Sequence, residues 1–180
     1  LYAEYHKNCP KGNFDFRLEA QERALESGMR SANVGALLGL CEFRKDFFFA
    51  GLHADFLMRR FPSAEIGVAV PRLNVFGPYI PPFPVTDLNL QQCIVAIRNF
   101  LPSAGISLST RECPQLRDLL VDCGITRLSA GSRTEVGGYA EFEAKTEGQF
   151  DVHDTRSVEE IVAMLKAKNY DPVFTDWRRI

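Results

Sequence analysis

Two short apolar runs separated by a helix-sized segment limit the possible folds of this chain more than any other feature. The runs cover residues 106–108 and 125–128, and each is followed by small hydroxylated residues and an arginine. Pro114 begins the segment between them, and proline is favoured at the first position of a helix. Two parallel strands joined by a crossover helix have this pattern. The polar residues would then gather at the carboxyl ends of the strands, where ligands commonly bind.

The same alternation of strand-sized and helix-sized segments continues along the rest of the chain. Strands are expected at residues 32–40, 66–70 and 172–174, and helices at residues 17–29, 43–61, 87–101 and 157–168. Repeated strand–helix units are typical of a parallel α/β fold. Four such units cannot close a barrel, which needs about eight strands. We therefore expect the other strands to come from an N-terminal half of the same barrel or from another chain.

Local signals predict where some helices begin and which face they bury. Thr86 is expected to cap the helix that follows it, and Ser157 with Glu160 has the spacing of a capping box. In the 43–61 segment, large apolar side chains recur at roughly helical spacing and predict one apolar face. That face would comprise Phe47, Phe48, Leu52, Phe56 and Leu57.

The net charge, the hydrophobic runs and the cysteines argue against a nucleic-acid partner, a membrane-spanning helix and disulfide bonds. With a net charge of -2 and no evident basic face, a nucleic-acid partner is not expected. No apolar run approaches the roughly 20 residues that a membrane-spanning helix needs. The five cysteines are widely spaced and lack a metal-binding motif, so we expect free thiols in a reducing, cytoplasmic compartment and no metal ligands in this chain. The chain begins without Met inside a predicted helix, so we expect a fragment of a longer protein.

Serines and an arginine at the two strand ends indicate a binding site for an anion, most simply a carboxylate. Arg111 can hold a carboxylate with two parallel hydrogen bonds, and Ser109 flanks it. Ser129 and Ser132 occupy the equivalent position one strand further along. Two alternatives stay open. Arg111 could pair with Glu112 or face solvent, and the serines could bond their own backbone, as loop serines commonly do.

A glycine-rich stretch at residues 35–42 and two further arginines are the other candidates. The glycines allow close backbone approach, and Leu37 would offer an apolar surface to a flat ring. Arg17 precedes a helix whose amino end could help to hold an anion, and Arg72 follows the 66–70 strand. The alternatives are a strand-to-loop turn without a ligand and solvated arginines. No Ser/His/Asp or Cys/His arrangement is evident, so no catalytic residue is assigned.

Short motifs in a fixed order give the chain a family resemblance. They are FRLEA at 16–20, VGALLGL at 34–40, VPRL at 70–73, LSTRE, LRD, GIT, LSAGS and GGY between 105 and 139, GQF at 148–150, and HDTRSVEE at 153–160. Over nearly all 180 residues, the chain resembles the C-terminal half of the 2-iminoacetate synthase family. These are the tyrosine lyases of bacterial thiamine biosynthesis, within the radical S-adenosylmethionine superfamily.

The resemblance implies a fold, a reaction and partners. The fold would be the second half of a parallel (β/α)8 TIM-type barrel over residues 1–140, with a C-terminal extension over residues 141–180. The N-terminal half of the barrel would hold a [4Fe-4S] cluster that cleaves S-adenosylmethionine. The Cα–Cβ bond of tyrosine would then break to give p-cresol and 2-iminoacetate (dehydroglycine), and a thiazole synthase would use the latter. This chain alone, without cluster ligands, would be inactive.

The resemblance also assigns roles to the candidate residues. The tyrosine carboxylate would be bound by Arg111 and Ser129, and the substrate side would also include Ser109, Ser132 and Arg72. Arg17 would meet the methionine carboxylate of S-adenosylmethionine. The adenine side of that cofactor would lie against Gly35, Ala36, Leu37 and Gly39.

Three other functions stay open at this point. A related tyrosine lyase of hydrogenase maturation makes carbon monoxide and cyanide, and it carries a second cluster on a C-terminal Cys-x-x-Cys that this sequence lacks. A non-catalytic α/β binding half-barrel would need no cluster. An aldolase-like barrel would have no radical chemistry.

Overall fold

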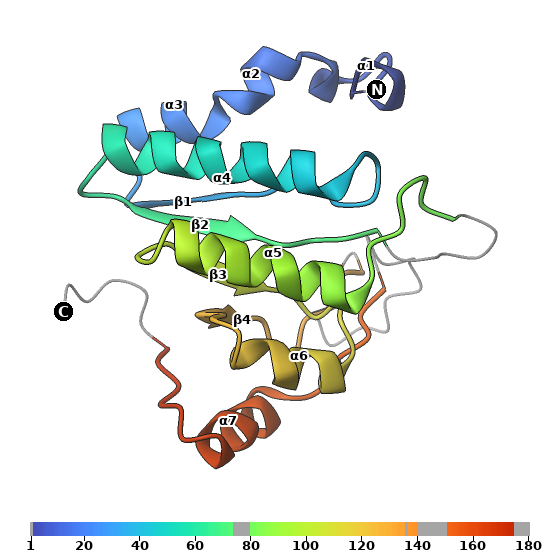
Figure 1. The fold of residues 1–180 in the computed structure, drawn as a ribbon, viewed down its shortest axis with the longest axis vertical. Helices are drawn as coiled ribbons and strands as arrows, with labels where there is room; N and C mark the ends of the chain where they lie inside the picture. Colours follow the sequence, from blue (N-terminus) through green and yellow to red (C-terminus); the bar gives the residue numbers. More distant parts are fainter. Residues whose placement is uncertain (1, 74–79, 136, 140–150, 175–180) are drawn as a thin grey trace. The chain divides into compact units, whose positions relative to one another are not determined.

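Four short strands form the sheet around which the chain is folded (Figure 1). The computed structural model describes residues 2–73, 80–135, 137–139 and 151–174. The strands are β1 (Ser31–Val34), β2 (Glu65–Ala69), β3 (Gly105–Leu108) and β4 (Arg127–Leu128), in the order β1-β2-β3-β4. β1 pairs in parallel with β2, and β2 with β3. The predicted parallel α/β fold is confirmed.

Helices precede, connect and follow the strands. They are α1 (Tyr2–Tyr5), the 3-10 helix η1 (Pro10–Gly12), α2 (Phe14–Leu18), α3 (Ala20–Glu26), α4 (Phe43–Arg60), α5 (Asp87–Phe100), α6 (Pro114–Val121) and α7 (Val158–Ala167). The chain divides into two compact units, Leu1–Ser107 and Leu108–Ile180. The predicted boundary between barrel and extension, at residues 140 and 141, involves positions outside the described residues.

The core of the first unit lies between the sheet and the helices that cover it. Ile66 and Val68 of β2 are buried, and so are Leu57 of α4 and Leu90 of α5. Helix α4 packs on β2 and helix α3 on β1, and Figure 1 shows α4 running along the strands. Burying an aliphatic side chain of this size contributes about 1.5–3 kcal/mol. This packing fixes the strand ends from which the candidate loops leave.

Helix α4 buries a different face from the one that its large apolar residues predict. Phe47 and Leu57 are buried, but Phe48, Phe56 and Leu52 are 61%, 47% and 40% exposed. The prediction of one apolar face is therefore wrong for these three residues. The buried face is completed instead by small residues, because the helices lie close together. A Cβ at Gly51 would come within 3.0 Å of the Ile97 side chain of α5.

Side-chain caps begin two helices where the sequence predicts them. Thr86 Oγ1 accepts a hydrogen bond from the backbone N–H of Asn89 at 3.2 Å, at the start of α5. At the start of α7, Ser157 Oγ accepts from the N–H of Glu160 at 3.2 Å, and the Glu160 carboxylate accepts from the N–H of Ser157 at 2.8 Å. These bonds satisfy backbone donors that the first turn of a helix leaves unpaired. Both predicted caps are confirmed.

Other predicted elements are shorter or broken. The helix predicted at 17–29 is split into α2 and α3 at Glu19, whose ψ of 1° departs from the helical value of about -42°. Gly28, with φ +93°, ends α3 as expected of a glycine after a helix. The strand predicted at 125–128 keeps only its last two residues, and the strand predicted at 172–174 is wrong, since these residues form none.

Two leucines on α5 provide a matched test of this packing. Leu90 is fully buried, whereas Leu88 is 70% exposed. We expect Leu90→Ala to lower the free energy of unfolding by about 2–5 kcal/mol, because it leaves a cavity in the core. Leu88→Ala should change it by no more than about 0.5 kcal/mol. Urea denaturation of both variants measures the difference, and equal losses would contradict the packing described.

Candidate functional site

The loop that follows β1 is held on both sides by backbone hydrogen bonds within the first unit. The N–H of Leu38 donates to the carbonyl of Pro71 at 2.9 Å, and the N–H of Leu73 donates to the carbonyl of Leu38 at 2.8 Å. The N–H of Phe83 donates to the carbonyl of Gly39 at 3.1 Å. The predicted glycine-rich loop is thus anchored to the end of β2 and to the segment that leads into α5.

Two positions of this loop require glycine, one because another segment lies too close for a side chain and one because of its backbone conformation. A Cβ at Gly35 would lie 2.7 Å from the carbonyl oxygen of Ala69, a distance that real side chains do not adopt. Gly39 has φ +113°, a conformation that glycine adopts readily and other residues rarely do. Between them, Ala36 is half-buried, while the side chain of Leu37 is 38% exposed. The loop therefore presents an apolar side chain on a fixed backbone.

The two arginines predicted for the first unit differ in their surroundings. Arg72 is 9% exposed; its Nη1 donates to the carbonyl of Val85 at 2.8 Å and its Nη2 to the Asp87 carboxylate at 2.6 Å. These bonds hold the start of α5. Arg17 is exposed and lies in α2, shortly before α3 begins. Arg72 thus has a clear role within its own unit, and Arg17 faces solvent.

In the second unit, the residues after β3 form a tight turn. Ser109 Oγ accepts a hydrogen bond from the backbone N–H of Arg111 at 3.4 Å. Arg111 is half-buried, and this burial lowers the pKa of its guanidinium, while the charge of Glu112 acts in the opposite direction. The hydroxyl of Thr110 is buried and, within the described structure, has no hydrogen-bond partner. A desolvated cation of this kind gains more from a carboxylate ligand than a fully hydrated one does.

The residues after β4 lie beside the end of β3. The backbone N–H of Ser129 donates to the carbonyl of Leu108 at 3.2 Å, and Ser129 itself is exposed. Ser132 is half-buried, and the next residue, Arg133, is held by the Tyr139 hydroxyl and the carbonyl of Gly138 at 2.9 and 2.8 Å. The structure thus brings the Ser129 turn next to the Ser109–Arg111 turn, as the sequence predicts for neighbouring parallel strands.

Sequence reasoning missed a buried group of charges beside these turns. Arg117 of α6 donates to the carboxylate of Asp154 and to the backbone carbonyl of Ser129. Burial alone would raise the pKa of Asp154, but hydrogen bonds from Arg156 and Arg117 outweigh it and lower the pKa to about 2. One signal could have revealed the group: Arg117 occupies a core position on the apolar face of α6, and a buried arginine needs a partner.

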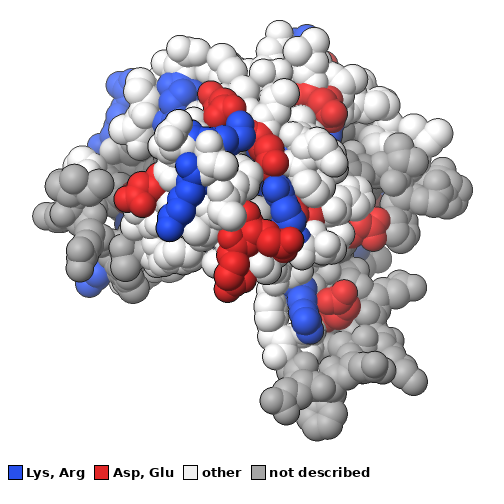
Figure 2. All heavy atoms as spheres, turned by 90° about the horizontal axis from the view of Figure 1, so that it is seen from below, with Lys and Arg blue, Asp and Glu red and all other residues white. Residues whose placement is uncertain are grey.

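Metal ligands and surface charge are two further features that bear on the function of the described residues. Within residues 2–73, 80–135, 137–139 and 151–174, no group of three or more His, Cys, Asp or Glu side chains could hold a metal ion. On the face drawn in Figure 2, Lys and Arg side chains are interspersed with Asp and Glu, so that face carries no patch of a single sign. Among the described helices, none is long and apolar enough to cross a membrane.

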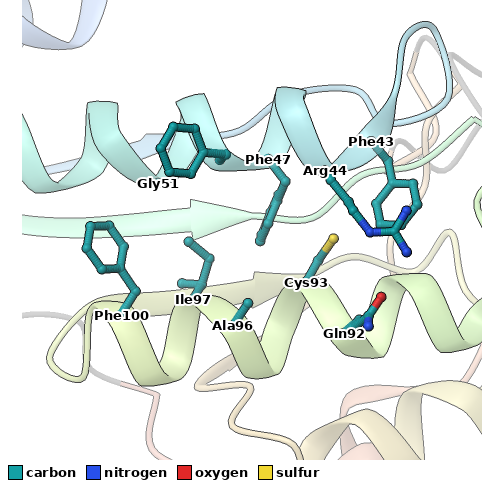
Figure 3. A pocket seen from close by; sticks show the side chains of 10 residues that line it. Phe43, Arg44, Phe47, Gly51, Gln92, Cys93, Ala96, Ile97 and Phe100 are labelled. Atoms are coloured by element: carbon teal, nitrogen blue, oxygen red, sulfur yellow. The ribbon is translucent and has the colours of Figure 1, made fainter.

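An apolar groove lies between α4 and α5, in the first unit (Figure 3). Its volume is about 400 Å³, and Phe47, Cys93, Ile97 and Phe100 line it together with Gly51. Burial raises the pKa of the Cys93 thiol to about 11, so this thiol stays protonated at neutral pH. None of the predicted site residues lines the groove.

Comparison with known proteins decides the family. Residues 70–171 match the model of the Biotin and Thiamin Synthesis associated domain. The chain belongs to this family. Two curated relatives, both named 2-iminoacetate synthase and from Salmonella typhimurium and Escherichia coli, are 35% and 36% identical over 98% of the chain. The chain spans 47% of the length of each, and the resemblance inferred from the motifs is confirmed.

Solved structures support the same fold for this member of the Biotin and Thiamin Synthesis associated domain family. A crystal structure of HydG, a maturase of the [FeFe]-hydrogenase, matches 97% of the chain with a TM-score of 0.85 and 34% identity, over 38% of its own length. HydG from Carboxydothermus hydrogenoformans matches 96% with a TM-score of 0.81 and 37% identity, over 40% of its length. The predicted half of a (β/α)8 TIM-type barrel is confirmed.

Two ion-paired aspartates of the second unit allow the buried network to be tested. At neutral pH, Asp154→Asn should lower the free energy of unfolding by about 3–5 kcal/mol, because it leaves Arg117 buried without a counter-charge. Asp122 pairs with Lys168 at 2.6 Å at the surface, so Asp122→Asn should cost far less. Urea denaturation of both variants measures the difference, and a larger loss in Asp122→Asn would contradict the network.

The same network predicts a dependence on pH. The pKa of Asp154 is lowered from 3.8 to about 2, so its carboxylate stabilises the folded state above pH 3.8. That contribution is lost as the pH falls towards 2. The difference in stability between the wild type and Asp154→Asn should therefore shrink over this range. A difference that stays constant from neutral pH to pH 2 would contradict the assignment.

Proposed function

We propose that the protein containing this chain is a radical S-adenosylmethionine tyrosine lyase. It would cleave the Cα–Cβ bond of tyrosine to give 2-iminoacetate (dehydroglycine) and p-cresol for thiazole and thiamine biosynthesis. The observation that carries the proposal is the match of both curated relatives, named 2-iminoacetate synthase, along 98% of the chain. Tyrosine is the substrate in this proposal, and a thiazole synthase is the partner that consumes 2-iminoacetate in the cytoplasm.

The tyrosine carboxylate is bound, in this proposal, at the two turns of the second unit. Arg111 supplies the positive charge, and the exposed Ser129 supplies a hydroxyl, with Ser109 and Ser132 nearby. The hydrogen bond from Ser129 to Leu108 supports this arrangement, because it places the two turns side by side. The partial burial of Arg111 also supports it, since a charge-assisted hydrogen bond from a partly desolvated guanidinium to a carboxylate is stronger than one in water.

The cofactors of the proposal are S-adenosylmethionine and a [4Fe-4S] cluster whose ligands lie outside this chain. When bound, they supply the one-electron chemistry that starts hydrogen abstraction from tyrosine. The adenine side of S-adenosylmethionine lies against the rigid loop of Gly35, Ala36, Leu37 and Gly39, and Arg17 binds its methionine carboxylate. The exposed side chain of Leu37 on a fixed backbone fits a flat ring. Arg72, which donates hydrogen bonds to Val85 and Asp87, lies on the substrate side in this proposal.

A second function is favoured by the solved structures. Two HydG maturases are 34% and 37% identical to the chain, close to the values for the curated relatives. The alternative is a tyrosine lyase of hydrogenase maturation. The two functions yield different products from tyrosine. The first ends at 2-iminoacetate, whereas the alternative converts the fragment left after p-cresol is released to carbon monoxide and cyanide.

One assay tests both functions. The full-length protein, reconstituted with iron and sulfide under nitrogen, is incubated with tyrosine and S-adenosylmethionine. We expect p-cresol, 5′-deoxyadenosine and 2-iminoacetate, without cyanide or carbon monoxide. Formation of cyanide and carbon monoxide would favour the alternative, and absence of both p-cresol and 5′-deoxyadenosine would exclude both functions. The 180-residue chain alone should show no turnover, since no cluster ligands are assigned to it.

Arg111 is the residue whose change tests the carboxylate site. In the full-length protein, Arg111→Ala should lower kcat/KM for tyrosine by about 30-fold or more, because truncating one partner of a buried charge pair costs at least about 2 kcal/mol. Arg59→Ala, which removes an exposed pair with Asp55 on α4, serves as control and should have little effect. The visible absorption of the cluster should be unchanged in both. Loss of that absorption in Arg111→Ala would instead show a structural role.

A further inference from the structure

One short segment of the second unit bridges the turns that follow β3 and β4. The backbone N–H groups of His153 and Asp154 donate to the carbonyl of Thr110 at 2.9 and 3.1 Å. Two residues further on, the carbonyl of Arg156 accepts from the N–H of Gly131 at 3.1 Å. We call residues 153–156 the strap. It is bonded to the residue before Arg111 on one side and to the turn that carries Ser129 on the other.

Arg117 joins the strap to the Ser129 turn a second time, through its side chain. One terminal nitrogen of its guanidinium donates to the Asp154 carboxylate, and the other donates to the backbone carbonyl of Ser129. The side chain of Arg117 is 1% exposed and that of Asp154 is 0% exposed. Water therefore cannot replace the bond to Asp154, and electrostatic interactions are stronger in such surroundings than in solvent.

The direction of the Arg117 side chain is set by further bonds around Asp154. Asp154 also accepts from Nη2 of Arg156 at 2.8 Å, and this same nitrogen donates to Asp118 of α6 at 2.8 Å. The Asp154 carboxylate is therefore held from two sides, and its rotation is restricted. Since Arg117 and Asp118 are neighbours on α6, the helix, the strap and the Ser129 turn form one bonded group.

We propose that Arg117 is a positioning residue for the substrate carboxylate, acting through the strap and the carbonyl of Ser129. This inference rests on the proposed function and deepens it. β4 is only two residues long, so its own ladder bonds give the Ser129 turn little support. Arg117 supplies that support and fixes the separation between Ser129 and Arg111. A displacement of about 1 Å at a binding group can cost about a hundredfold in rate.

The variant Arg117→Lys tests the proposal in the full-length, reconstituted protein. Lysine keeps a positive charge near Asp154, but a single ammonium cannot present a planar fork to two acceptors. We expect KM for tyrosine to rise about tenfold or more, within the hundredfold scale of such displacements. KM for S-adenosylmethionine should stay within about twofold, because its proposed contacts lie in the first unit. Hydrogen exchange at the amides of Ser129 and Gly131 should also become faster.

A control removes another ion pair of the same unit. Lys168→Met breaks the surface pair with Asp122 at 2.6 Å, which joins α7 to the end of α6 without touching either turn. For this variant, KM for tyrosine and the rate of hydrogen exchange at the amides of Ser129 and Gly131 should equal those of the wild type.

Where Arg117→Lys does not fold, Asp118→Asn is used instead. It keeps the buried pair and loosens Arg156, and KM for tyrosine should rise by a smaller factor.

The outcomes separate this inference from the proposed function. A wild-type protein that does not cleave tyrosine defeats the proposed function and the inference together. An active wild type with an unchanged KM for tyrosine in Arg117→Lys, or in Asp118→Asn when that variant is needed, overturns the inference alone. An equal loss for both substrates with a lowered melting temperature also overturns it, because it shows a purely structural role. A selective rise in KM for tyrosine supports it.

Discussion

The buried ion pair between Arg117 and Asp154 is the interaction on which the second unit depends. A strand of two residues makes few ladder bonds, so backbone pairing gives limited support to the turn that follows β4. The Arg117 guanidinium adds charge-assisted hydrogen bonds to the Asp154 carboxylate and to the backbone carbonyl of Ser129. A buried pair of this kind adds little net stability, but breaking it is costly, so it favours one arrangement of the turns over others.

The first unit fixes its candidate loop by a different physical means. There the backbone itself makes the contacts, and glycine is needed wherever two segments approach too closely for a side chain. Gly35 lies against Ala69, and Gly39 adopts a positive φ beside the segment that leads into α5. The proposed cofactor side is thus held by backbone hydrogen bonds and the proposed substrate side by buried charges. A substitution that weakens the proposed cofactor side therefore need not weaken the proposed substrate side.

Local signals in the sequence predict much of the fold, and long-range packing explains what they miss. Strands β2 and β3, the helix from Asp87 and the caps at Thr86 and Ser157 follow from periodicity and from residues a few positions apart. The exposed Phe48 was not predicted, because Gly51 lets α4 approach α5 and sets which face is buried. The partner of Arg117 was missed because it lies 37 residues away.

The motifs predicted the family, but not how the candidate site residues are held. Arg72 illustrates the difference, since the strand end that it follows was predicted while its bonds to Val85 and Asp87 were not. Thr110 is a second case. The sequence pattern pointed to no role for it, whereas the structure shows a buried hydroxyl without a partner among the described residues.

The most direct test of this account is a crystal structure of the full-length protein with tyrosine bound. We predict that the tyrosine carboxylate lies within hydrogen-bond distance, about 2.7–3.2 Å, of the Arg111 guanidinium and the Ser129 hydroxyl. Arg117 should still join Asp154 to the Ser129 carbonyl in that complex. A carboxylate bound elsewhere, with Arg111 and Ser129 far from the substrate, would contradict the central claim.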